Sequence, residues 1–185
     1  MLFIPLKLLA LPLALLLVVG GFLLYKDWQK KKNYQASYLE WKIEKHLREG
    51  DEESAKRLIE EGLKKGGAFK PLIASHLLEL NPQREVEIIQ QILSDLRDKQ
   101  MIALYTERLA FAYLKEGNKE KSLQILNSID KESFNYPSAQ ILKAQVLLDI
   151  GKKEEARKVL EEVIKENKGT YWSNLAQALL KGIEG

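Results

Sequence analysis

Apolar residues recur at helical spacing along most of the chain. Four segments carry apolar or small residues at positions i, i+3, i+4 and i+7, and they begin at Ala55, Ile89, Ser122 and Ala156. This spacing puts the residues on one face of an amphipathic helix. The four starting positions lie 34, 33 and 34 residues apart. A repeat of this length predicts stacked pairs of helices.

Turn-forming residues precede each of these helices and indicate an earlier helix in each pair. Gly50, Gly117 and Gly151 stand where a helix should end with a residue of positive φ, and Asn81-Pro82 has the corresponding place in the second pair. We therefore predict first helices over residues 34–49, 71–80, 101–115 and 137–150. A last amphipathic helix, over residues 170–183, is expected to cap the stack.

The N-terminal region has a different pattern. Residues 8–24 carry no charge, and with the preceding residues the apolar stretch reaches about 25 residues, enough to cross a hydrocarbon core of ~30 Å. A cleaved signal peptide is the alternative, because Val19 and Gly21 could mark a cleavage site. The apolar run continues beyond them to Tyr25. We therefore predict an uncleaved, single-pass transmembrane helix.

A basic and aromatic collar follows the apolar run and fits the interface between membrane and water. The predicted collar residues are Tyr25, Lys26, Trp28, Lys30, Lys31 and Lys32. The expected organisation is an anchor at residues 1–25, the collar at 26–33, helical repeats at 34–168 and a capping helix at 169–185. The predicted fold class is all-α, with a transmembrane helix followed by an α-solenoid of about four helical hairpins.

Composition narrows the possible chemistry. The chain has 185 residues and no cysteine, so disulfides, cysteine nucleophiles and zinc ribbons are excluded. The formal charge of +3 comes from the N-terminal lysines, because acidic and basic residues nearly balance from residue 33 onward. A balanced body has no basic face for phosphates, so we expect no nucleic-acid partner.

Two of the predicted hairpins resemble tetratricopeptide repeats in their residue types and spacing. The matching residues are Tyr113, Gly117, Ser122, Leu126 and Ile129, and then Leu147, Gly151, Ala156, Leu160 and Val163. Ala110 and Ala144 match the small residue at which paired helices approach closely. The first two hairpins are degenerate, with His46 in the aromatic position of the first and Ile89 in the small position of the second.

The plan of the chain is similar to the YfgM-type family, the ancillary subunits of the SecYEG translocon. Residues 109–114 before Gly117, and residues 142–151 before Ala156, look most like that family. The resemblance implies a location in the inner membrane, a body facing the periplasm, and the translocon, a periplasmic chaperone or an unfolded client as partner. Lysines 30–32 favour the opposite orientation by the positive-inside rule. A cytoplasm-facing membrane scaffold unrelated to export is therefore the alternative.

The repeat resemblance also implies a concave face for binding protein partners. The expected groove residues are Leu104, Glu107, Phe111, Leu114, Ser138, Ile141, Gln145 and Leu148. The alternative is that the apolar members of this set form core between repeats. Domains that clamp a carboxylate place lysine and asparagine where this chain has Glu107, Phe111 and Ile141. We therefore expect an apolar or extended segment as ligand.

The sequence offers little for catalysis, and an enzyme is the remote alternative. His46 and His76 are 30 residues apart and have no acidic or cysteine partner at the spacing of metal ligands. Residues 66–70 (GGAFK) lack the ending of a phosphate-binding loop and follow a helix. We predict no catalytic residue, cofactor, metal or small-molecule substrate.

Overall fold

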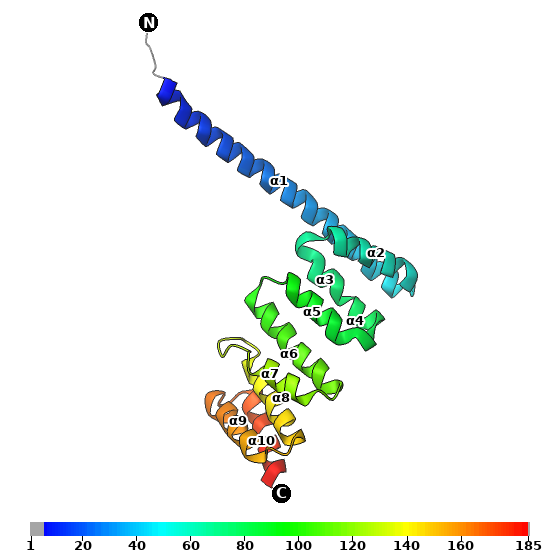
Figure 1. Cartoon of the computed structure of the whole chain (residues 1–185), viewed down its shortest axis with the longest axis vertical. Coiled ribbons are helices and arrows are strands. Elements are labelled where there is room, and N and C mark those ends of the chain that lie inside the picture. Colours follow the sequence, from blue (N-terminus) through cyan, green and yellow to red (C-terminus); the bar gives the residue numbers. More distant parts are fainter. Residues whose placement is uncertain (1–5, 185) are drawn as a thin grey trace. The chain divides into compact units, whose positions relative to one another are not determined.

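The computed structural model describes residues 6–184, with side chains described over residues 14–183 (Figure 1). Every regular element within this range is helical, which confirms the predicted all-α class. The chain divides into two compact units, Met1–Ile73 and Ala74–Gly185. Each unit is a set of helices joined by turns and loops.

The first unit contains one long helix, α1 (Leu6–Arg48), followed by α2 (Glu52–Lys65), η1 (Gly67–Phe69) and the beginning of α3 (Lys70–Ser75). Helix α2 packs against the C-terminal part of α1 (Figure 1). Ala36 and Ile43 are buried on α1, as are Ala55 and Ile59 on α2. The first predicted hairpin is therefore present, and its first helix is the end of a much longer one.

Helix α1 runs without interruption through the predicted anchor, the collar and the first repeat helix. No helix in the described part of the chain is long and apolar enough to cross a membrane. The transmembrane helix predicted at residues 1–25 falls partly outside the described residues. The anchor therefore stays a prediction, and the expected boundary after Tyr25 is not a break in the helix.

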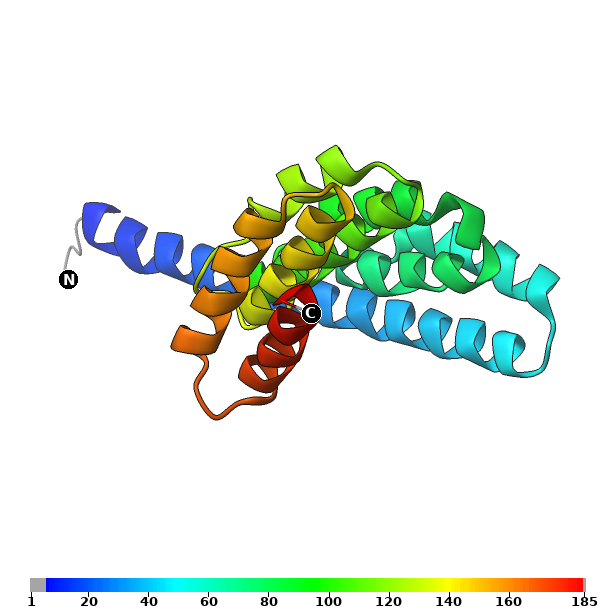
Figure 2. The same cartoon turned by 90° about the horizontal axis from the view of Figure 1, so that it is seen from below.

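The second unit is a succession of antiparallel helices. Its elements are α4 (Leu77–Leu80), η2 (Pro82–Arg84), α5 (Glu85–Asp95), α6 (Lys99–Lys115), α7 (Lys119–Leu126), α8 (Tyr136–Asp149), α9 (Lys153–Glu166) and α10 (Tyr171–Glu184). Helix α6 packs against α5 and α7, and α8 packs against α7 and α9. Figure 2 shows α8, α9 and α10 side by side, with α10 in the position predicted for a capping helix.

The first helix of the second pair is shorter than predicted. A single helix was expected over residues 71–80, but α3 ends at Ser75 and α4 begins at Leu77, with His76 between them. Pro71 lies at the start of the segment and no glycine lies within it, so the local sequence gives no reason for a break at His76. The chain divides into its two units within α3, three residues before the break.

Three turns between paired helices share one backbone geometry. Gly50, Gly117 and Gly151 have φ values of 77°, 81° and 79°, in the left-handed region that a side chain disfavours. In each turn the amide of the next residue donates to the carbonyl five residues earlier, at 2.9, 2.9 and 2.8 Å. These bonds satisfy carbonyls at the end of the first helix. The turn thus reverses the chain within a few residues.

The residue at which each of the four repeat segments begins, on the second helix of its pair, is fully buried. Ala55, Ile89, Ser122 and Ala156 all have exposed fractions of 0%, as do Ala110 and Ala144 on the facing first helices. Ala144 and Ala156 belong to one apolar cluster with Leu160 and Ala176. The alanine and serine side chains among these residues are small enough for neighbouring helices to approach closely. The predicted repeat register is therefore the packing register.

Ala156→Leu and Ala144→Leu should each destabilise the 185-residue chain by about 1–3 kcal/mol, because the added carbons overpack a contact without free space. Ala178→Leu is the matched control, since Ala178 is exposed on α10. Urea unfolding followed by circular dichroism measures the difference. Unchanged midpoints for both core variants would contradict the assigned register.

Candidate functional site

A groove of about 560 Å³ lies in the second unit, lined mainly by α6 and α8. Leu104 and Phe111 of α6, Phe134 of the loop before α8, and Trp172 of α10 supply its large apolar side chains. Leu104, Phe111 and Phe134 are 40%, 48% and 61% exposed. Large apolar side chains gathered at one hollow are typical of a binding surface.

The structure brings together most of the groove residues expected from the sequence. Those that line the groove are Leu104, Glu107, Phe111, Ser138, Ile141 and Gln145. Ile141 is only 5% exposed and belongs to the core as much as to the groove. Leu114 and Leu148 do not line it, because they pack half-buried against the two apolar clusters of this unit.

Further lining residues were missed by the sequence analysis. They are Arg108, Phe134, Asn135, Leu142 and Trp172. Phe134 and Asn135 precede α8 and therefore lie outside any helical periodicity. Trp172 lies on α10, the helix that the sequence predicted only as a cap. An exposed phenylalanine in a polar loop was the available signal for Phe134.

A buried asparagine ties the two walls of the groove together. Asn135 is 3% exposed, and its Nδ2 donates to the carbonyl of Ala103 at 3.0 Å and to Oε2 of Glu107 at 2.6 Å. The hydroxyl of Ser138 lies 3.0 Å from the same carboxylate oxygen. These contacts join α6 to the beginning of α8 and hold Glu107 at a fixed place in the groove.

Ion pairs lie beside the groove. Glu85 accepts from Nζ of Lys115 at 2.5 Å, and its other oxygen lies 3.6 Å from Nε of Arg108. Lys115 also lies 6.0 Å from the centre of the Phe111 ring. Both cations are about half exposed, so the pairs themselves add little stability. These ion pairs hold the side chains of Arg108 and Lys115 next to Glu85.

The predicted collar residues follow one another along α1. Tyr25, Lys26, Trp28, Lys30 and Lys31 are exposed, and Lys32 is half-buried. The Tyr25 and Trp28 rings are 6.1 Å apart, and Nζ of Lys32 lies 5.1 Å from the centre of the Trp28 ring. Aromatic rings beside lysines are compatible with the predicted interface, and their contact with a membrane stays a prediction.

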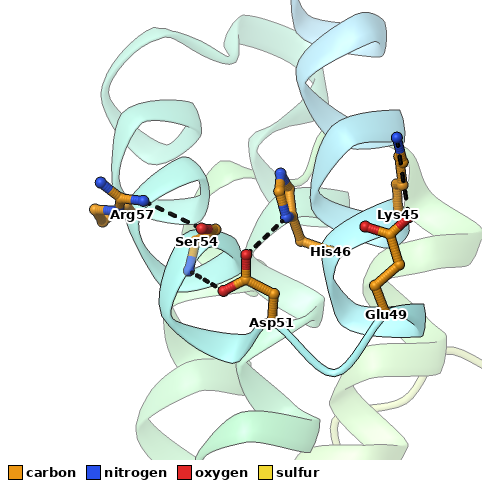
Figure 3. Close-up of polar contacts among 6 residues, drawn as sticks. All are labelled: Lys45, His46, Glu49, Asp51, Ser54 and Arg57. Carbon is orange, nitrogen blue, oxygen red and sulfur yellow. Dashed lines mark hydrogen bonds and ion pairs between the residues drawn. The ribbon is translucent and has the colours of Figure 1, made fainter.

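His46 belongs to a small polar cluster at the turn between α1 and α2 (Figure 3). Its Nδ1 lies 3.1 Å from Oδ2 of Asp51, whose Oδ1 accepts from the amide of Ser54 at 3.1 Å. The Ser54 hydroxyl accepts from Arg57 at 3.1 Å. Asp51 thus caps the N-terminus of α2. The contacts of Ser54 with Asp51 and Arg57 are those of a capped turn at the beginning of α2.

Metal ligands were not predicted, and the described residues contain no group of three or more histidine, aspartate or glutamate side chains that could hold a metal ion. His76 lies between α3 and α4, far along the chain from the His46 cluster. The candidate binding surface is the groove of the second unit, where exposed apolar side chains gather.

Asp51→Ala should lower the urea midpoint of the chain at neutral pH, because α2 loses its N-cap. Hydrogen bonds from Ser54 and the charge of His46 hold the pKa of Asp51 below its ordinary value of 3.8. A lowered folded-state pKa means that this stabilisation is complete above pH 3.8 and is lost as the pH falls through the folded-state pKa. The difference in urea midpoint between Asp51→Ala and the unmodified chain should therefore become smaller in acid.

Glu53→Ala is the control for this cap, because Glu53 is exposed in the same turn of α2. The capping role would be contradicted if Asp51→Ala lowered the urea midpoint equally at every pH. It would also be contradicted if the control lowered the midpoint as much.

Residues 7–184 match the model of the tetratricopeptide repeat-like domain family. An uncharacterized protein of Aquifex aeolicus (strain VF5) is 35% identical over 88 residues, which cover 48% of this chain and 52% of that protein. The chain thus spans about half the length of the curated relative it matches. No solved structure matches the chain.

Proposed function

Because the chain belongs to the tetratricopeptide repeat-like domain family, we propose that it is a scaffold that holds a segment of another protein in the groove between α6 and α8. Domains of this kind generally bind proteins and are typically not catalytic. The observation that carries the proposal is the exposure of Leu104, Phe111 and Phe134 on one hollow surface.

The dimensions and walls of the groove support a peptide segment as ligand. A volume of about 560 Å³ accommodates a few large side chains, and the hollow is open along the helices instead of closed around a small molecule. Covering a large apolar side chain contributes roughly 1.5–3 kcal/mol. Two or three such side chains of a partner would give useful affinity after the cost of ordering the segment.

The N-terminal part of α1 acts, in this proposal, as a membrane anchor at residues 1–25. The apolar residues from Leu15 to Leu24 are 47–74% exposed, and a bilayer would cover this surface. Tyr25, Trp28 and the lysines that follow suit the headgroup layer. Anchoring would confine the groove to a thin layer and raise its effective concentration towards a membrane partner.

The proposed partners are those implied by the resemblance to YfgM-type proteins: the export translocon, a periplasmic chaperone or an unfolded client. The corresponding location is the inner membrane, with the body outside the cytoplasm. The three consecutive lysines from Lys30 to Lys32 favour a cytoplasmic body instead. A cytoplasm-facing assembly scaffold is the second candidate.

Leu104→Glu combined with Phe111→Glu should reduce capture of partners by crosslinking in intact membranes about tenfold or more, because the apolar wall supplied by α6 becomes charged. Both positions are exposed, so the chain should stay helical by circular dichroism. Ile141→Glu is unsuitable, since Ile141 is 5% exposed and would bring a carboxylate into the core. Met101→Glu, on α6 but outside the groove, is the control. Equal capture by the double variant and the control would refute the groove as the binding surface.

Protease added to spheroplasts should digest the helical body before the membrane is broken, if the body lies outside the cytoplasm. The N-terminal sequence of the chain recovered from cells tests the anchor in the same samples. A body protected until lysis would favour the cytoplasmic scaffold, and a mature chain beginning near Phe22 would rule out an uncleaved anchor.

A further inference from the structure

We infer that the segment held in the groove carries a lysine or arginine side chain that pairs with Glu107, with large apolar side chains beside it. The inference rests on the proposed function and specifies its ligand. It follows from the hydrogen bonds and charges at the floor of the groove.

The carboxylate of Glu107 is only half satisfied. Its Oε2 accepts from Asn135 and lies within hydrogen-bond distance of the Ser138 hydroxyl, whereas its Oε1 accepts no hydrogen bond from the described residues and remains accessible to solvent. Both neighbours are neutral, and no described cation pairs with Glu107. The negative charge therefore remains uncompensated between apolar walls, where screening by water is reduced.

Two cations beside the groove, Arg108 and Lys115, are already engaged. Arg108 lines the groove, but its Nε lies 3.6 Å from Oε1 of Glu85, and Lys115 donates to the other oxygen of the same carboxylate. The side chain of Glu85 is 16% exposed, so losing both cations would leave a partly buried, unpaired charge. In the described part of the chain both cations contact Glu85, and neither pairs with Glu107.

The two side chains that contact Glu107, those of Asn135 and Ser138, are neutral and have no further hydrogen to donate. Both amide hydrogens of Asn135 are used, one by the Ala103 carbonyl and one by Glu107. The Oδ1 of Asn135, a residue that is 3% exposed, accepts no hydrogen bond. The ammonium of lysine and the guanidinium of arginine are donors only, and they form strong bonds to carboxylates. A carboxylate from a partner would meet repulsion at this point.

The apolar walls of the groove indicate which side chains lie beside the lysine or arginine of the bound segment. Phe111 and Leu104 lie on the same helix as Glu107, and Phe134 enters from the loop before α8. Their exposed surfaces fit apolar side chains placed beside the basic one. The chemistry of the ligand is therefore a short basic and apolar stretch of polypeptide.

Three labelled peptides, titrated into the purified 185-residue chain and followed by fluorescence anisotropy, test the inference. They are acetylated and amidated hexapeptides of sequence GFLKLG, the same peptide with norleucine in place of lysine, and the same peptide with glutamate there. The chain should bind the lysine peptide about tenfold more tightly than the norleucine peptide, and the glutamate peptide more weakly still. Raising the salt concentration should reduce the lysine preference.

Glu107→Gln should abolish the preference for lysine, so that the lysine and norleucine peptides bind with equal affinity. The amide oxygen of glutamine can still accept from Asn135 and Ser138, so the groove should keep its form. Glu161→Gln, at an exposed position of α9 outside the groove, is the matched control and should keep the preference.

The outcomes separate this inference from the proposed function. Equal binding of all three peptides, or a lysine preference that survives Glu107→Gln, overturns the inference and leaves a purely apolar groove. Tighter binding of the glutamate peptide overturns it in favour of Arg108 and Lys115 as the charged partners. Failure of every peptide to bind removes support from both the groove and the inference.

Discussion

The close approach of paired helices is the constraint on which the second unit depends. A glycine at positive φ reverses the chain at each of Gly117 and Gly151, and a fully buried small residue, Ser122 or Ala156, follows five residues later. The turn fixes where the second helix begins, and the small side chain fixes how near it lies. Since both recur with the same spacing, each pair presents its first helix in the same way.

The groove is a consequence of that regular placement. Helices α6 and α8 are the first helices of consecutive pairs and contact each other, so their outer faces supply two walls. Asn135 then bonds the beginning of α8 to the backbone of α6 and to Glu107. Apolar walls and a held carboxylate thus arise from the packing of the repeats, and this combination distinguishes the groove from a simple gap in the core.

Much of the fold could be predicted from the sequence because helical periodicity and left-handed glycines are local signals. Features that depend on packing were less visible. The break at His76 has no local cause, and the lysine-rich segment around residues 26–33 looked like a separate collar although α1 continues through it. In the groove, periodicity identified Phe111 but could not show that Ile141 is buried or that the loop residue Phe134 reaches the same hollow.

The central claim is that the hollow between α6 and α8 is where this chain holds polypeptide. Amide chemical shifts of the isotopically labelled chain, recorded during titration with the lysine hexapeptide, test it most directly. The account predicts saturable shifts confined to residues 104–111, the residues from Phe134 to Gln145, and the neighbourhood of Trp172. Shifts concentrated on α1 and α2, or spread evenly over the chain, would contradict it.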